Sequence, residues 1–176
     1  MMEWNRPRSV RQIGSVPGRE RIYVEDYVMR FAKRLAAKQS EPEKAAMLLG
    51  NQYHYNGQKI VQISGIVEIP QFARRNSPVL SPQSWDSVYT EIKENFTDLD
   101  IVGWFYTARD FDRQDAGKLL EIHKANFQHR DKVLYILDEK EQEDGMFLYH
   151  MGNFERQQGY YIYYEKNLQM QNYMIE

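Results

Sequence analysis

The sequence contains no cysteine, which excludes disulfide bridges, thiolate nucleophiles and zinc sites with cysteine ligands. It also contains no uncharged apolar stretch near the roughly 20 residues that a membrane-spanning helix needs. The first residues, Met1 to Arg6, lack the apolar segment of a secretory signal peptide. We therefore expect a cytoplasmic protein without a membrane partner.

An excess of charge of one sign is missing as well. The chain has 23 basic and 25 acidic residues, a formal net charge of −2, so no overall field attracts nucleic acid or anionic lipid. Arg6, Arg8 and Arg11 lie close together, but no aromatic residues are interleaved with them as a stacking platform for bases. We expect no nucleic-acid partner.

The remaining composition is that of a globular protein. Apolar residues make up 42% and charged residues 27% of the 176 positions, which suits one domain with a core of its own. Residues 1–19 hold four arginines, two prolines and two glycines without a sustained period, which predicts a flexible N-terminal arm. We assign the domain to residues 20–165. Residues 166–176 form a C-terminal tail, in part a short amphipathic helix without a cap, which leaves open a further region after it.

Helical and strand patterns alternate between residues 20 and 165. Asn56-Gly57 is a two-residue turn signal between two strands, and Gly65 predicts a bulge or a bend in the second of them. Ser81 before Pro82 is typical of a helix start, and the expected buried face of this helix consists of Trp85, Val88, Tyr89 and Ile92. The predicted helices cover residues 25–37, 82–96 and a segment ending near residue 126, and the predicted strands include residues 45–49, 60–67, 101–106, 133–137, 146–150 and 158–164. The fold class is α/β, with a mixed central sheet flanked by helices.

Three segments resemble conserved blocks of the MPN family (JAB/JAMM-type domains). The segment Glu43-Lys-Ala-Ala-Met-Leu-Leu-Gly50 resembles the family's first block, an acidic residue before an apolar strand that ends in Leu-Gly. Asp100-Ile-Val-Gly-Trp-Phe-Tyr-Thr-Ala-Arg109 resembles its Val-Gly-Trp-Tyr-His-Ser-His-Pro strand, and Lys132-Val-Leu-Tyr-Ile-Leu-Asp138 resembles its Ala-Val-Val-Val-Asp strand. The order and spacing agree over roughly residues 20–165, so the resemblance implies a single MPN domain.

In active family members two histidines and an aspartate hold zinc, a glutamate acts on the bound water, and a serine supports the transition state. The glutamate falls on Glu43 and is retained. The first histidine, the serine after it and the second histidine fall on Tyr106, Thr107 and Ala108, and the catalytic serine and the metal-binding aspartate fall on Ala116 and Leu119. Zinc needs nitrogen or charged oxygen donors, and the metal lowers the pKa of its bound water. The resemblance therefore implies a domain without metal, cofactor or catalytic residues.

Three functions follow as hypotheses. The first is a non-catalytic protein-interaction or scaffold domain, for which the resemblance implies a partner that is another MPN-type domain or a second copy in a dimer. The second is a hydrolase with a rebuilt site in the same cleft, using Glu43, Tyr106 and Thr107. The third is a regulatory N-terminal domain of a larger protein. A relocated metal site, in which His123 or His129 joins Asp110, Asp112 or Asp115, is disfavoured, because the two histidines are six residues apart.

Overall fold

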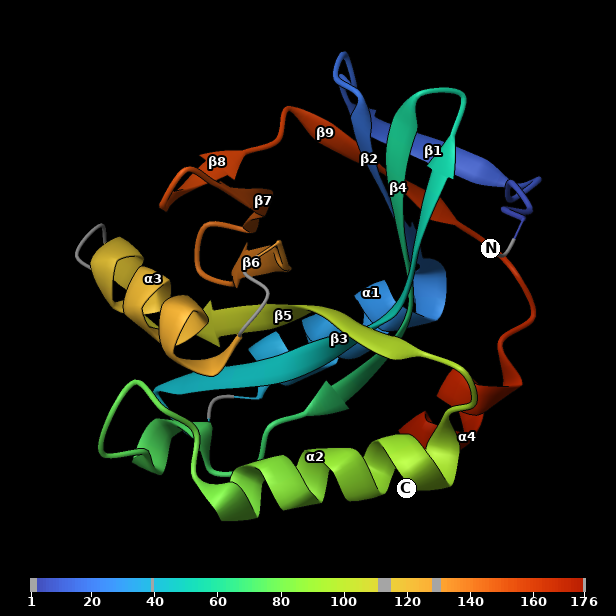
Figure 1. Ribbon diagram of the computed structural model, residues 1–176. Coiled ribbons are helices and arrows are strands. Elements are labelled where there is room, and N and C mark those ends of the chain that lie inside the picture. The colour runs from blue at the N-terminus through green and yellow to red at the C-terminus, as the bar shows by residue number, and fades with distance from the viewer. Residues whose placement is uncertain (1–2, 39, 111–114, 128–130, 176) are drawn as a thin grey trace.

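The computed structural model describes residues 3–38, 40–110, 115–127 and 131–175. In these ranges the chain forms one nine-stranded mixed sheet, four α-helices and a short 3-10 helix (Figure 1). The prediction of an α/β fold with a mixed sheet is confirmed. None of the helices in these ranges is long and apolar enough to cross a lipid bilayer.

The elements follow one another along the chain in the order shown in Figure 1. The strands are β1 (Val10–Gly14), β2 (Glu20–Glu25), β3 (Glu43–Tyr55), β4 (Gln58–Glu68), β5 (Asp100–Ala108), β6 (Val133–Asp138), β7 (Glu143–His150), β8 (Asn153–Arg156) and β9 (Gly159–Tyr163). The helices are α1 (Asp26–Ala37), η1 (Phe72–Arg74), α2 (Pro82–Asn95), α3 (Asp115–Asn126) and α4 (Leu168–Ile175).

The sheet has the strand order β1-β9-β2-β4-β3-β5-β6-β7-β8. The pairs β2 with β4, β2 with β9 and β5 with β6 are parallel, and the remaining neighbours are antiparallel. The sheet is curled, so that β9 approaches β6 and β7 (Figure 1). Tyr135 on β6 and Tyr160 on β9 both donate hydrogen bonds to Asp144 Oδ2 on β7, at 2.7 and 2.6 Å, and these bonds join the two halves of the sheet.

Local signals in the sequence set several boundaries. The β3–β4 hairpin turns at Asn56 and Gly57, whose φ angles of 51° and 76° are the positive values that this turn requires. Along β3 and β4 the register shifts between Leu49, opposite Gly65, and Gly50, opposite Ile63, which confirms the predicted bulge. Helix α2 begins after Ser81, whose side chain accepts a hydrogen bond from the backbone of Ser84.

The prediction of a flexible N-terminal arm over residues 1–19 is wrong for the part that the structure describes. Residues 10–14 form β1, which pairs with β9 at one edge of the sheet. Trp4 is only 7% exposed and packs edge-on against Tyr23, and its indole N–H donates to Gln62 Oε1 at 2.8 Å. Proline, glycine and arginine content gives no sign of this contact, because the apolar patch that Trp4 covers is built from strands distant in sequence.

Two further expectations need correction. Tyr89, predicted on the buried face of α2, is 56% exposed, whereas Val88 is fully buried. Residues 166–176 are part of the domain as far as the structure describes them, because Met170 of α4 is fully buried and α4 packs against α1, α2 and β4. The short edge strand β8 has no predicted counterpart, since its four residues alternate too briefly to show a period.

Candidate functional site

Glu43 is the first residue of β3, and its carboxylate lies beside the end of β5. The two strands are antiparallel, with Glu43 opposite Ala108 and Ala45 opposite Tyr106. Because side chains alternate along a strand, Glu43, Tyr106 and Ala108 share one face of the sheet. The Tyr106 hydroxyl donates to Glu43 Oε2 at 3.2 Å. The glutamate and the first histidine position of the family pattern are therefore neighbours in space.

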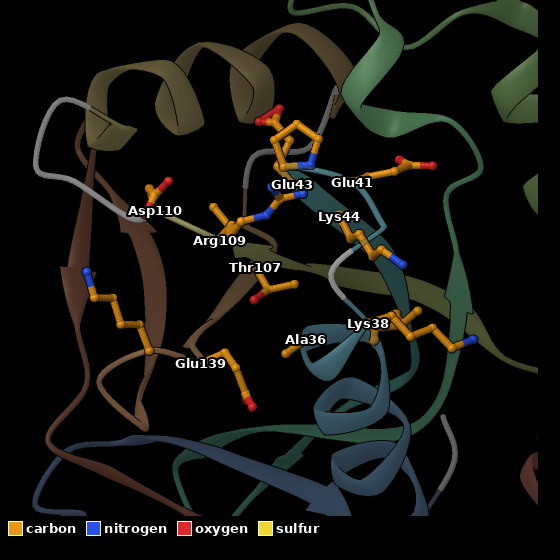
Figure 2. Close-up of a pocket in the computed structure, with 13 residues that line it drawn as sticks. Ala36, Lys38, Glu41, Glu43, Lys44, Thr107, Arg109, Asp110 and Glu139 are labelled. Atoms are coloured by element: carbon orange, nitrogen blue, oxygen red, sulfur yellow. The ribbon is translucent and has the colours of Figure 1, made fainter.

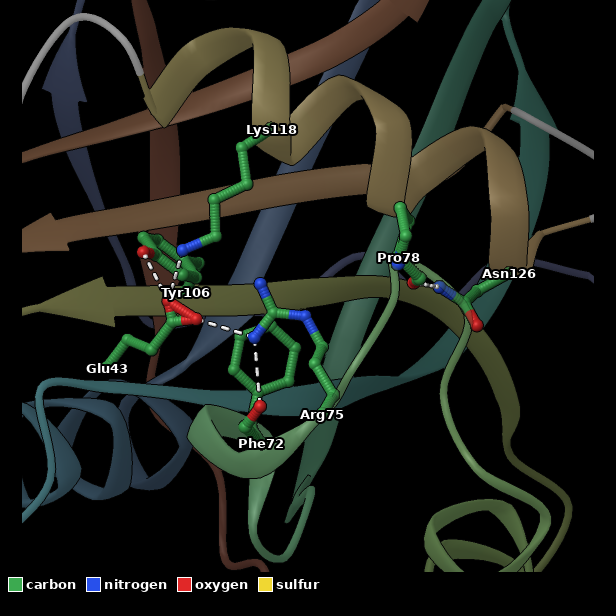
Figure 3. Close-up of polar contacts among 7 residues, drawn as sticks. All are labelled: Glu43, Phe72, Arg75, Pro78, Tyr106, Lys118 and Asn126. Atoms are coloured by element: carbon green, nitrogen blue, oxygen red, sulfur yellow. Dashed lines mark hydrogen bonds and ion pairs between the residues drawn. The ribbon is translucent and has the colours of Figure 1, made fainter.

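Two cations hold the Glu43 carboxylate from opposite sides (Figure 3). Arg75 Nη1 lies 2.5 Å from Oε1, and Lys118 Nζ of α3 lies 2.5 Å from Oε2. Arg75 follows η1 and is itself positioned by that turn: its Nη1 also donates to the Phe72 carbonyl at 2.9 Å, and its guanidinium stands 4.1 Å from the centre of the Phe72 ring. Glu43, Arg75, Lys118 and Tyr106 are called the Glu43 cluster below.

The Glu43 cluster keeps its glutamate ionised. Burial by itself would raise the pKa of Glu43, but the hydrogen bonds and charges of Lys118 and Arg75 outweigh it and hold that pKa below its ordinary value. Burial and the neighbouring Glu43 charge raise the pKa of Tyr106, so its hydroxyl stays protonated. A general base needs a pKa near the working pH and a free acceptor. Glu43 has neither, because both carboxylate oxygens already accept from cations.

The other residues of the family pattern are dispersed. Thr107 lies on the opposite face, and its hydroxyl donates to the Leu137 carbonyl at 2.8 Å. Ala108 is buried beside Glu43, Ala116 is exposed on α3, and Leu119 is 1% exposed in the core. Of the three groups considered for a rebuilt hydrolytic site, only Glu43 and Tyr106 are therefore brought together.

Sequence reasoning missed both cations of the cluster. Lys118 stands one residue before Leu119, the position at which the family spacing places a metal-binding aspartate, and it is Lys118 whose side chain reaches Glu43. Arg75 is 32 residues from Glu43 and belongs to a proline-containing loop. No local pattern marks it, since only the fold brings η1 against the start of β3.

The donor set does not fit a metal. Among the described residues no group of three or more histidines, aspartates and glutamates gathers at one place. At Glu43 the nearest charged groups are two cations, which repel a divalent ion. His123 is fully buried and accepts a hydrogen bond from the Trp104 indole N–H through Nδ1 at 3.0 Å, and its ring stacks on Tyr149. Its environment is that of a core residue, and His129 and Asp112 lie outside the described residues.

A cavity of about 360 Å³ adjoins the cluster where α1 ends, β3 begins and β5 ends (Figure 2). Glu43 forms part of its wall, but Lys44, Thr107 and the end of α1 line it from the other face of the sheet. The turn between β6 and β7 closes one side through Glu139 and Lys140. The start of β3 thus separates the Glu43 cluster from a hollow of ligand size.

Comparisons with known proteins inform the fold alone. No family model matches the chain, and no curated protein matches it. Among solved structures, the chain is similar to the solution structure of protein DSY2949 from Desulfitobacterium hafniense, with a TM-score of 0.54 and 12% sequence identity. The match covers 82% of this chain and 93% of the other. At this identity the likeness shows a shared fold and carries no statement about activity.

Proposed function

We propose that the chain is a cytoplasmic, non-catalytic MPN-like domain that acts as a protein-interaction or scaffold module. The observation that carries the proposal is the state of Glu43. Its two carboxylate oxygens are held by Arg75 and Lys118, two cations on the face where the family pattern places zinc. A carboxylate in this state stabilises the fold and has no capacity to activate a water molecule.

The arrangement of β3, β5, α3 and β6 supports the MPN-like part of the proposal. The family pattern needs its glutamate and its histidine positions close together, and here Glu43 and Tyr106 are in hydrogen-bond contact on adjacent antiparallel strands. The strand is followed by a helix that reaches the same site through Lys118, and then by the parallel strand β6. The order of elements agrees with the order of the three conserved blocks.

The cations explain why losing the metal need not unfold such a domain. A metal site gathers negative charge, and a glutamate left there alone would be buried without compensation, at a cost of several kcal/mol. Arg75 and Lys118 supply the positive charge instead, and they join η1 and α3 to the central strands. The resemblance implies that the partner is another MPN-type domain or a second copy of this chain.

Three measurements on one preparation test the absence of catalysis: elemental mass spectrometry, a thermal melt with and without zinc, and incubation with an isopeptide-linked model substrate. We expect no stoichiometric metal, an unchanged melt and no cleavage. Glu43→Gln is the matched variant, expected to melt at lower temperature because Arg75 and Lys118 lose their anion. One zinc per chain, or cleavage that disappears in Glu43→Gln, would overturn the proposal.

The scaffold part needs its own measurement. Sedimentation velocity over a range of concentrations, alone and with a purified MPN-type domain, is expected to show a dimer or a one-to-one complex. A chain that remains monomeric at all concentrations and forms no such complex contradicts the proposed partner class.

A further inference from the structure

The wall of the cavity next to the Glu43 cluster contains a cation of its own, Lys44. Because side chains alternate along β3, Lys44 points to the face opposite the Glu43 carboxylate. In Figure 2 its side chain lies between Glu41 and Lys38, with Thr107 on the neighbouring strand. Lys44 and Thr107 are directly opposite each other in the β3–β5 pairing, so both line the cavity from the sheet.

Lys44 is only 7% exposed, and its side chain makes no hydrogen bond or ion pair with any residue that the structure describes. The Lys44 Nζ is not among the buried polar atoms that lack a hydrogen-bond partner, so the ammonium opens onto the cavity and is accessible to an anion there. The other nearly buried charge at the start of β3, Glu43, has two cationic partners. Lys44 therefore differs from Glu43: where Glu43 faces charged partners from the protein, Lys44 faces the cavity.

The charge around the cavity favours a ligand with one negative charge. Glu43 can be set aside, because Arg75 and Lys118 already match it. The remaining wall then carries one more basic than acidic side chain, and the surplus charge is best assigned to the unpaired Lys44. The basic residues are Lys38, Lys44, Arg109 and Lys140, and the acidic residues are Glu41, Asp110 and Glu139.

We propose that this cavity binds a small carboxylate, of the size of an amino acid or of the last residue of a peptide, with the carboxylate on the Lys44 ammonium. The volume of about 360 Å³ lies at the lower end of the range for small-ligand sites. An ammonium–carboxylate contact is a charge-assisted hydrogen bond and supplies the missing anion. The site uses Lys44 and not the Glu43 cluster, so it stands apart from the proposed scaffold function.

The test is an NMR titration of isotope-labelled protein with alanine, N-acetyl-alanine and N-acetyl-alaninamide at millimolar concentration. Both carboxylates share the group that Lys44 recognises, and the amide lacks it. We expect the carboxylates to shift the backbone signals at the start of β3, the end of β5 and the end of α1, and the amide to leave them in place. Stronger binding of alanine indicates a free amino acid as the natural ligand, and stronger binding of N-acetyl-alanine indicates a peptide C-terminus.

Variants assign the binding to Lys44. Lys44→Met is expected to weaken carboxylate binding at least about tenfold, as for the loss of a charge-assisted hydrogen bond. Lys44→Arg retains the cation and is expected to retain binding, and Lys140→Met removes an exposed wall charge and is expected to change it by about twofold or less. A thermal melt of each variant reports folding.

Three results overturn the proposal: equal shifts with the amide, shifts away from the cavity, or unchanged affinity in Lys44→Met. The first two are read from the unmodified protein, so the test remains decisive even where Lys44→Met does not fold.

Discussion

Replacing Glu25 with glutamine is expected to remove a pH dependence of folding stability. Glu25 is 1% exposed and caps the N-terminus of α1, where its Oε2 accepts from the Tyr27 backbone at 2.8 Å and from Asn167 Nδ2 at 3.4 Å. Its other oxygen, Oε1, is buried and has no hydrogen-bond partner among the described residues. Burial disfavours the charged form and raises the pKa of Glu25 to about 7.

The direction of the effect follows from the two pKa values. In the unfolded chain the Glu25 carboxyl has its ordinary pKa of 4.5, so between that value and about 7 the folded protein binds the proton more tightly. The resulting stabilisation is fully present below the unfolded pKa and is lost as pH rises through the folded pKa. With 1.36 kcal/mol for each pKa unit, the loss is on the order of 3 kcal/mol.

The assay is urea denaturation of the protein and of Glu25→Gln, at several values between about pH 5 and pH 8. Glutamine can still accept a hydrogen bond from the Tyr27 N–H but has no charge to bury. As pH rises, the unfolding free energy of the wild type should therefore fall relative to that of Glu25→Gln. Asp26→Asn is the control at the neighbouring carboxylate: the Asp26 charge raises the Glu25 pKa less than burial does, so most of the pH dependence should remain. A difference between wild type and Glu25→Gln that stays constant over this range would refute the reasoning.

Two further predictions concern contacts between distant segments. Arg75→Met is expected to lower the free energy of unfolding by about 3 kcal/mol, since Arg75 and Glu43 are both nearly buried. Lys118→Met should lower it less, because the Lys118 side chain is 41% exposed. Chemical denaturation of both variants measures these losses of unfolding free energy, and equal losses in the two variants would contradict the prediction. Trp4→Ala is expected to cost about 3 kcal/mol in the same assay, with the exposed Asn5→Ala as control, because it empties a buried contact. A Trp4→Ala protein as stable as its control would mean that the N-terminal segment does not pack in solution.

The fold could be predicted from the sequence wherever local chemistry decides the structure. Asn56 and Gly57 specify their turn by backbone conformation, and Ser81 with Pro82 specifies the start of α2. Where the deciding contact joins distant segments, the local signal is absent or misleading. Trp4 follows this rule: its neighbours in sequence are typical of a loop, and its neighbours in space are aromatic side chains of β2 and β3.

The candidate site was predictable in part for the same reason. Glu43 and Tyr106 belong to strand patterns with recognisable order and spacing, and the antiparallel pairing of β3 with β5 brings them together. Arg75 comes from a loop whose path depends on η1 packing against the core, and Lys118 depends on the rotation of α3 about its axis. Neither the path of this loop nor the rotation of α3 is encoded in a short sequence pattern. The two cations that decide the chemistry of Glu43 could therefore not be predicted from the sequence.

Glu43 and Lys44 show how one peptide bond can separate two kinds of site. Both residues are nearly buried and both carry a charge, but the Lys44 ammonium opens onto the cavity. Strand alternation sends Glu43 toward α3 and η1, which provide two cations, and sends Lys44 toward the end of α1 and a hollow. A charge whose partners come from the protein stabilises the fold and loses reactivity, whereas a charge without a partner retains binding energy for a molecule from outside. On this argument the start of β3 is the place to look for ligand recognition, on the Lys44 face and not on the face where the family pattern places its chemistry.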